Sequence, residues 1–270
     1  MNHPAVRAAI NRRVTGNPQL WPIAWLREVV DRQVPFARVL SIGCGLGAFE
    51  RTLVELGIAS HISGIDASAE MIQRAQESAA ESGMAQRISY FASDARDFLG
   101  GARDLDAVFF HASLHHFDRL SDLLRLVREA LAPRGILYLD EFAGPARNEW
   151  TWRHLLRWNA VYWGLPRTVR RTRIVRRPIN RVDPTEAIAS SGILPAVAEH
   201  FRVLIRRDYG GNLLAPIYPS LLRPDQPGGP SAAEFDVAIE ALLAREEVLL
   251  RRESGFNTVV VAEPRLRADS

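Results

Sequence analysis

Between residues 37 and 140, short runs of apolar residues alternate with stretches whose apolar side chains recur every three or four positions. The short runs predict buried strands at 38–42, 61–65, 87–91, 105–110 and 135–140. The amphipathic stretches predict helices at 48–57, 69–82 and 119–132. Helix-stopping residues follow each of them, at Gly57, Gly83 and Pro133. This alternation is typical of a parallel sheet whose strands are joined by crossover helices.

Outside this region the pattern changes. Residues 146–165 predict an aromatic-rich helix, and a further helix is expected near 185–199. They are followed by predicted elements in the order strand 201–207, Gly- and Pro-rich loop 210–230, helix 232–251 and strand 256–262. We therefore expect an N-terminal helical cap at 1–36 and a main domain at 37–270. Two segments, 146–200 and 210–254, are interpreted as insertions in that domain.

The first predicted strand ends abruptly in alternate glycines. A buried strand needs Val, Leu and Ile, whereas the turn after it needs residues that tolerate positive φ and let a ligand approach the backbone. The turn therefore predicts a nucleotide-like cofactor, which would contact Gly43, Cys44, Gly45 and Gly47. Gly43, Gly45 and Ala48 also fit the pattern of dinucleotide-binding folds, so a nicotinamide-dependent oxidoreductase stays open as an alternative.

Two acidic residues follow the next two strands. Asp66 comes after the second strand, where a carboxylate accepts hydrogen bonds from both hydroxyls of a ribose. Asp94 comes after the third strand, where a carboxylate suits an exocyclic adenine amine, which only donates. Ala67 and Ala95 follow these acids and are expected to line the same pocket. A helix cap for Asp66 and a plain turn for Asp94 are the structural alternatives.

Composition narrows the class of protein. The chain has 270 residues, of which 47% are hydrophobic, enough for a large core. It lacks an apolar run of membrane-spanning length and a secretory leader, so we expect a soluble cytoplasmic protein. The single cysteine, Cys44, excludes a disulfide within the chain and a metal site made of several cysteines. All 34 basic residues are arginine, so only their clustering carries information.

Taken together, these motifs resemble class I S-adenosylmethionine-dependent methyltransferases. The resemblance rests on four matches: the turn from Val39 to Phe49, the ribose acid Asp66, the adenine-edge acid Asp94, and the run from Asp106 to Phe110. It implies S-adenosylmethionine as cofactor and S-adenosylhomocysteine as product. The implied fold is a Rossmann-like doubly wound α/β sheet of seven mostly parallel strands with an antiparallel last strand.

Further motifs resemble a bacterial subgroup of these enzymes that is often associated with glycosyltransferases and surface polysaccharides. They are Asn11 to Gly16, Ser113 to His116, Glu141 to Pro145 with Trp150 and Thr151, Asp183 to Ala187, and Tyr209 to Gly211. The subgroup usually has Glu-Tyr where this chain has Glu141-Phe142. Any role for that tyrosine hydroxyl is therefore in question here.

A hydroxyl acceptor needs a general base, which should lie just beyond the carboxyl ends of the fourth and fifth strands. The candidates there are His111, His115, His116, Asp140 and Glu141. We favour His116, with His115 close behind, because a neutral imidazole accepts a proton near pH 7, and keep Glu141 as the alternative base. His111 is also expected beside the cofactor. No ordered ligand spacing indicates a metal, so we predict none, although His111, Asp140 and Glu141 would be the set to consider.

The segment after the fifth strand is rich in tryptophan and arginine. Trp152, Leu155, Leu156 and Trp163 fall on one helical face, which we expect to pack against the domain; a lid over the acceptor and attachment to a membrane surface are the alternatives. Seven arginines follow within fifteen residues, namely Arg167, Arg170, Arg171, Arg173, Arg176, Arg177 and Arg181. They indicate a solvated basic face, a site for a phosphate-bearing acceptor, or contact with nucleic acid or a membrane.

The favoured function is methyl transfer from S-adenosylmethionine to a hydroxyl oxygen of a small-molecule or carbohydrate acceptor by in-line displacement. A nucleic-acid substrate is disfavoured, because the chain has no [Asn/Asp]-Pro-Pro-aromatic sequence after the fourth strand. The rival functions are an NAD(P)-dependent oxidoreductase and a noncatalytic module that binds S-adenosylmethionine or RNA. Peripheral contact with a membrane stays open, and the sequence predicts no oligomeric state.

Overall fold

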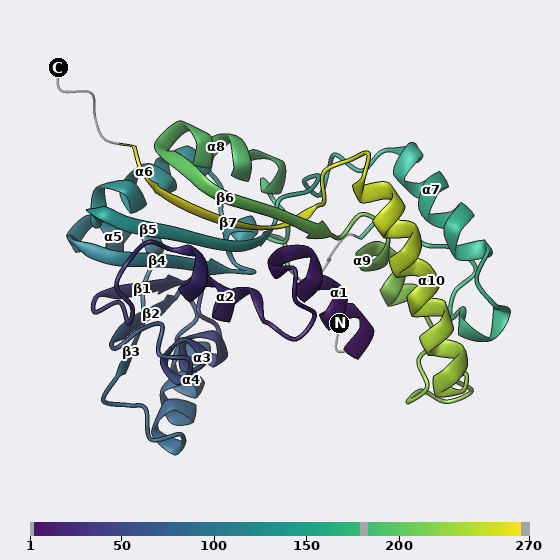
Figure 1. The fold of residues 1–270 in the computed structure, drawn as a ribbon, viewed down its shortest axis with the longest axis horizontal. Coiled ribbons are helices and arrows are strands. Elements are labelled where there is room, and N and C mark those ends of the chain that lie inside the picture. The colour runs from purple at the N-terminus through teal and green to yellow at the C-terminus, as the bar shows by residue number, and fades with distance from the viewer. Residues whose placement is uncertain (1–2, 179–182, 266–270) are drawn as a thin grey trace.

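A seven-stranded sheet forms the centre of the protein in the computed structural model, which describes residues 3–178 and 183–265 (Figure 1). The strand order is β3-β2-β1-β4-β5-β7-β6. The strands are β1 (Val39–Ile42), β2 (Ile62–Asp66), β3 (Ile88–Ala92), β4 (Leu105–His111), β5 (Leu131–Phe142), β6 (Phe201–Gly210) and β7 (Asn257–Pro264). In the described sheet β7 runs antiparallel to both of its neighbours, β5 and β6, and the other pairs of adjacent strands are parallel. The predicted fold class is therefore confirmed.

Helices cover both faces of the sheet, which explains why β1 is buried at every position. One face is packed by α2 (Pro22–Val29), α3 (Ala48–Glu55) and α4 (Ala69–Glu81), and the other by α5 (Ala95–Gly101), α6 (Leu120–Ala130) and α8 (Ile193–His200). The sequence did not predict the short α5, which ends in two glycines. The helix expected at 185–199 begins later, at Ile193, after a turn of 3₁₀ helix at Ser190–Gly192.

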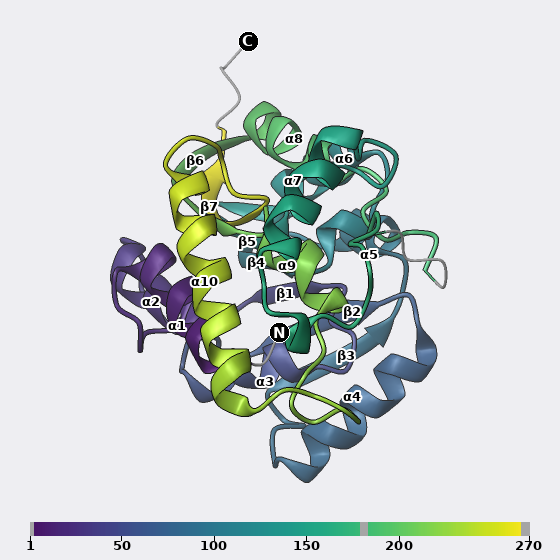
Figure 2. The same ribbon diagram turned by 90° about the vertical axis from the view of Figure 1, so that its right-hand side faces the viewer.

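A second group of helices lies beyond the end of the sheet toward which β6 points (Figure 1). It consists of α1 (Pro4–Thr15), α7 (Trp152–Trp163), the short α9 (Leu214–Ile217) and α10 (Ala232–Leu250). Figure 2 looks onto this group and shows α7, α9 and α10 in front of the sheet. The group has its own core around Trp158, Tyr162 and Leu242. The boundaries of the cap and of the two insertions stay predictions.

The orientation of α7 differs from the prediction. Trp152, Leu156 and Trp163 are exposed by 62%, 58% and 54%, so the stripe expected in the core faces outward. Trp158 and Tyr162 are buried instead, because their polar tips find partners inside. The Trp158 indole donates to the carbonyl of Asn212 at 2.8 Å, and the Tyr162 hydroxyl donates to that of Ser220 at 2.8 Å. The prediction that the stripe packs against the domain was wrong for these three residues, whereas Leu155, the fourth, is half-buried and packs against this core.

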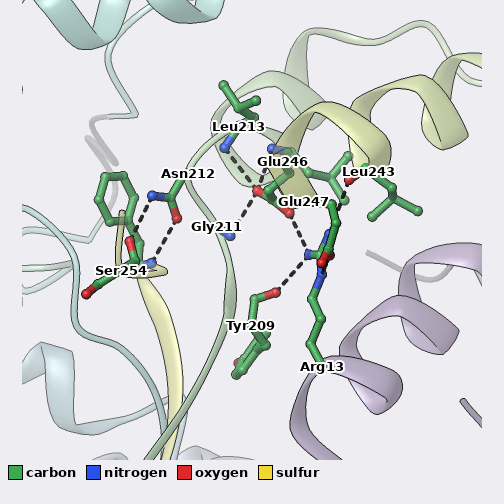
Figure 3. A network of polar contacts seen from close by, with 11 residues as sticks. Arg13, Tyr209, Gly211, Asn212, Leu213, Leu243, Glu246, Glu247 and Ser254 are labelled. Atoms are coloured by element: carbon green, nitrogen blue, oxygen red, sulfur yellow. Dashed lines mark hydrogen bonds and ion pairs between the residues drawn. The ribbon is translucent and has the colours of Figure 1, made fainter. Parts of the chain in front are cut away.

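Arg13 of α1 and Glu246 of α10 form an ion pair, and the contacts of both with the end of β6 tie the helical group to the sheet (Figure 3). The Arg13 guanidinium donates to Glu246 Oε2 at 2.9 Å and to the carbonyl of Tyr209 at 3.0 Å. Glu246 Oε1 accepts from the amide of Gly211 at 3.1 Å and from two further amides, those of Leu213 and Leu214. A Cβ at Gly210 would lie 2.5 Å from Glu246 Oε2. The Tyr-Gly-Gly motif therefore shapes the end of β6.

Candidate functional site

The three glycines of the turn after β1 all have positive φ, but they do different things. A Cβ on Gly43 would lie 2.6 Å from Cβ of Ser113, and one on Gly47 would overlap the Tyr90 hydroxyl. These two glycines allow close packing between elements. At Gly45, where φ is 51°, no described atom lies within 4 Å of a Cβ position. Gly45 is thus the glycine whose backbone is open to a ligand.

Asp66 holds this turn in place. Its Oδ2 accepts from the Gly45 amide at 3.0 Å, and its Oδ1 accepts from the Ser68 amide at 2.9 Å. Ser68 is the residue that caps α4, by accepting from the Met71 amide at 3.3 Å. The helix-cap role considered for Asp66 therefore belongs to Ser68. Each Asp66 oxygen keeps a lone pair for a further hydrogen bond.

A cavity of about 540 Å³ lies beside Gly45 and Asp66 at the carboxyl ends of β1, β2 and β3. It contains six of the nine predicted cofactor residues, namely Gly43, Gly45, Asp66, Ala67, Asp94 and Ala95. Asp94 also caps α5, where its Oδ1 accepts from the amides of Arg96 at 2.7 Å and Asp97 at 3.3 Å. His116, Asp183 and Thr185 also line this cavity.

A second cavity, of about 360 Å³, lies on the other side of the glycine turn and shares Gly43 with the first. Two of the remaining predicted residues, Cys44 and His111, line this cavity, whereas Gly47 lines neither. The His111 ring stacks on Phe49, with centroids 4.4 Å apart. Burial raises the pKa of the Cys44 thiol, so this cysteine stays protonated.

Glu50 in the wall of the second cavity was not predicted. Its side chain is buried, and its Oε1 accepts a hydrogen bond from the Ser41 hydroxyl at 2.5 Å. Its Oε2 has no hydrogen-bond partner among the described residues. Burial raises the pKa of Glu50 to about 7. The sequence could have indicated that Glu50 is buried, because Glu50 and the core residue Leu53 are three positions apart and therefore lie on the same face of the helix.

The predicted bases do not gather in one place. Asp140 and Glu141 are neighbours on β5 and therefore point to opposite faces of the sheet. Asp140 joins His111 in the second cavity, where its Oδ2 lies 4.0 Å from His111 Nε2 and its Oδ1 accepts from the Tyr209 hydroxyl at 2.6 Å. Burial raises the pKa of Asp140. The sheet therefore separates Glu141 from His111 and Asp140, the two residues with which it was considered as a metal site.

Glu141 is buried on the other face, and both of its oxygens are occupied. Oε1 accepts from the amides of Ser113 at 2.6 Å and Leu114 at 2.7 Å. Oε2 lies 2.8 Å from Nδ1 of His115, which is also buried. Burial lowers the pKa of His115, but the hydrogen bond and charge of Glu141 outweigh this effect and leave the pKa raised above 6.5.

The segment from Asp183 to Ala187 folds back over the two histidines. The Thr185 hydroxyl lies 3.0 Å from His116 Nδ1, and Glu186 Oε1 lies 3.6 Å from His115 Nε2. Among the described residues, His115, His116 and Glu186 bring one potential ligand atom each within 4.8 Å of one another, the spacing of a potential metal site. The sequence analysis included Glu186 in a subgroup motif but assigned it no role, because its position depends on how the segment after β5 returns to the sheet.

The sheet order, the open glycine turn and the acid at the end of β2 define a Rossmann-like methyltransferase fold. Residues 39–135 match the family described as a methyltransferase domain. Residues 39–135 therefore resemble a methyltransferase domain, and the match favours S-adenosylmethionine over a nicotinamide as cofactor.

Among curated proteins, the trans-aconitate 2-methyltransferase of Streptomyces avermitilis is 29% identical over 134 residues, which are 44% of this chain and 49% of that protein. The mitochondrial ubiquinone biosynthesis O-methyltransferase of Saccharomyces cerevisiae is 32% identical over 108 residues, which are 39% of this chain and 34% of that protein. The match thus spans less than half of either relative.

Among solved structures, a geranyl diphosphate C-methyltransferase from Streptomyces coelicolor A3(2), in complex with Mg²⁺, geranyl diphosphate and S-adenosylhomocysteine, superposes with a TM-score of 0.57. The alignment covers 95% of this chain and 87% of that one at 15% identity, so it shows a common fold. None of the helices formed by residues 3–178 and 183–265 combines the length and hydrophobicity of a membrane span.

Proposed function

We propose that this protein transfers a methyl group from S-adenosylmethionine to a hydroxyl oxygen of a small-molecule or carbohydrate acceptor. The observation that carries this proposal is the buried contact between His115 and Glu141. It places an oriented imidazole directly beside His116, which lines the cavity at the glycine turn. An acceptor hydroxyl must lose a proton during the transfer. The His115 imidazole, which is oriented by Glu141, can accept that proton.

The residues around the larger cavity fit the cofactor. Its volume of about 540 Å³ lies within the range of about 300–1,000 Å³ that is usual for ligand pockets. In this proposal Asp66 accepts from the ribose hydroxyls, the Gly45 backbone faces the ligand, and Asp94 with Ala95 borders the adenine. S-adenosylmethionine, when bound, supplies a methyl group on an electrophilic sulfonium. The protein therefore has to orient the acceptor and exclude water.

His115 is the preferred base in this proposal, ahead of His116. An ionised carboxylate only accepts hydrogen bonds, so the Glu141 contact keeps the proton of His115 on Nδ1 and leaves Nε2 to accept one. Glu141 cannot itself serve as the base without giving up a buried hydrogen bond, and we assign it a positioning role. His116, with Thr185 at its Nδ1, is assigned to the wall of the cofactor cavity.

A small cavity near this pair suggests where the acceptor enters. Glu186, which lies 3.6 Å from His115 Nε2, also lines a cavity of about 130 Å³ together with Phe142 and Trp150. The names of both curated relatives describe methyl transfer to small molecules, and that of the yeast relative describes transfer to oxygen. The resemblance of several sequence motifs to the bacterial polysaccharide-associated subgroup supports a carbohydrate acceptor.

The test is methyl transfer from radiolabelled S-adenosylmethionine into a panel of sugars, sugar phosphates, phenols, small carboxylic acids and RNA. We expect label in an oxygen-linked methyl group and a large loss of rate in His115→Ala with unchanged affinity for S-adenosylhomocysteine. His61→Ala, at an exposed histidine before β2, is the matched control. Label on carbon or nitrogen, or a fully active His115→Ala, would refute the proposal. Binding of NADH without S-adenosylhomocysteine would support the oxidoreductase instead.

A further inference from the structure

The outer face of α7 carries a stripe of large apolar side chains. Trp152, Leu156 and Trp163 are spaced by four and seven residues, so they lie within about 40° of one another around the helix. They are exposed by 62%, 58% and 54%, although the opposite face of the same helix is fully buried at Trp158 and Tyr162. Scattered exposed residues of this kind are normal, whereas a row of three on one helix marks a contact surface.

The segment that follows α7 adds a further exposed apolar side chain next to this stripe. The Trp163 indole donates to the carbonyl of Arg173 at 3.1 Å, and Asn159 exchanges hydrogen bonds with the backbone of Val175. The segment around residues 172–175 therefore runs alongside α7. Ile174 within it is 46% exposed. We call Trp152, Leu156, Trp163 and Ile174 the α7 surface.

Positive charge surrounds the α7 surface. Residues 150–178 contain eight arginines and no aspartate or glutamate. Of these arginines, only Arg157 forms an ion pair within the described part of the chain, with Glu253. The Arg153 guanidinium lies 5.5 Å from the centre of the Trp152 ring. Arg181, the last of the arginines noted in the sequence, lies outside the described residues.

We propose that the α7 surface binds the face of an anionic phospholipid membrane. Tryptophan and arginine are the residues that suit the boundary between headgroups and acyl chains, and Leu156 and Ile174 add apolar area to insert. A purely solvated basic face does not account for the exposed tryptophans. Nucleic acid would neutralise the arginines but leave the aliphatic side chains uncovered. A second copy of the chain would bring two strongly positive faces together.

Membrane binding would also bring the acceptor pocket close to lipid. Trp150 and Pro178, which lie at the two ends of the arginine-rich segment, both line the small cavity that contains Glu186. An acceptor carried on a lipid could therefore reach that cavity from the membrane. This last step rests on the proposed function, whereas membrane binding itself does not.

The test is co-sedimentation of the full chain with vesicles of phosphatidylglycerol and phosphatidylcholine, and with phosphatidylcholine vesicles alone. We expect binding to the anionic vesicles that weakens with salt, together with a blue shift of tryptophan fluorescence. Arg173→Glu combined with Arg176→Glu and Arg177→Glu should weaken binding by a factor of about 100. Trp152→Ser combined with Leu156→Ser should weaken it at least tenfold and leave S-adenosylhomocysteine binding unchanged.

Val237→Ser combined with Val248→Ser is the matched control, because these α10 side chains are 62% and 55% exposed but lie outside the arginine-rich segment. Loss of vesicle binding in this control to the same extent would overturn the proposal. So would equal binding to neutral vesicles, or no binding to anionic ones. A dimer detected by sedimentation equilibrium and abolished by the Trp152 and Leu156 substitutions would assign the surface to a second copy. These readouts need no methyl transfer, so they fail independently of the proposed function.

Discussion

Nδ1 of His115 lies 2.8 Å from Oε2 of Glu141, and the other oxygen of that carboxylate is held by two backbone amides of the loop that carries the histidine. Glu141 thus fixes both the loop and the ring. The imidazole is held in one orientation and one tautomer before any acceptor arrives. If His115 is the base, the geometry of Glu141 should matter to the rate more than to cofactor binding.

Replacing Glu141 with Gln should lower kcat by a factor of about 10² to 10⁴, the range that general base catalysis supplies. The amide lacks the charge and no longer dictates which His115 nitrogen holds the proton. Single-turnover kinetics measure the effect, and calorimetry with S-adenosylhomocysteine should show unchanged affinity. Glu55→Gln, at an exposed position on α3, is the control. An equal rise in KM with kcat preserved would argue against positioning of a base.

The pH dependence of the rate should reflect His115. Its pKa is raised above 6.5, because the hydrogen bond and charge of Glu141 outweigh burial. The base must be neutral, so kcat should rise with pH through this pKa, and Glu141→Gln should move the midpoint to lower pH. The same raised pKa contributes stability that is complete below the unfolded pKa and is lost as pH rises through the folded one. A rate profile flat across this range would exclude His115 as the base.

Glu50 should make the protein less stable as pH rises. Its pKa is about 7 in the folded state against 4.5 ordinarily, so the folded protein holds this proton more tightly. Its contribution is full below the ordinary pKa, and about 3 kcal/mol is lost as pH rises through about 7. Glu50→Gln should flatten this slope and exceed the wild type in stability at about pH 8.5. Urea denaturation measures it, with Glu55→Gln as the comparison; an unchanged slope would contradict the assignment.

Asp66→Ala should weaken S-adenosylhomocysteine binding by about 1.5–3 kcal/mol, the value of hydrogen bonds to a charged group. Asp66 also holds the amides of Gly45 and Ser68, so the variant tests both the ribose contact and the shape of the turn. Ser68→Ala separates the two effects, because it removes the cap of α4 from the same turn without touching the proposed ribose contact. Calorimetry that found equal losses in both variants would remove the ribose assignment.

Chelation with EDTA should leave methyl transfer unchanged in the proposed mechanism, because His115 acts through its own nitrogen. The closeness of His115, His116 and Glu186 makes this a decisive measurement. Loss of activity on chelation, restored by one divalent metal and absent in Glu186→Gln, would reassign these three side chains as metal ligands. Metal content measured by mass spectrometry on the purified protein provides the independent readout.

The sheet and most of its helices could be predicted because their signals are local. The apolar run of 39–42 and the amphipathic spacing around Leu53 depend only on neighbours in the sequence. The outward orientation of α7 could not be predicted, because all its faces are rich in apolar residues. Its buried face is defined by long-range contacts, namely the packing of Trp158 and Tyr162 in the core of the helical group and their hydrogen bonds to Asn212 and Ser220.

Some residues of the candidate site could likewise be predicted from local sequence patterns, whereas others could not. The residues around Gly45 and Asp66 follow the ends of strands. Their positions could be predicted because the carboxyl ends of parallel strands lie at one edge of the sheet. The fixed alternation of side chains along β5 separates Asp140 from Glu141, but the sequence alone did not reveal which one meets a histidine. Glu186 depends on the return of a segment about 70 residues from His115, a distance across which no local pattern operates.

The Arg13 to Glu246 pair joins residues separated by 233 positions. During synthesis on a ribosome Arg13 emerges before any strand of the sheet, whereas Glu246 emerges after every strand except β7. The bonds of Arg13 to Glu246 and to the carbonyl of Tyr209 can therefore form only after most of the described chain has been translated. Glu246 holds the end of β6, which can therefore reach its final form only after α10 has been made.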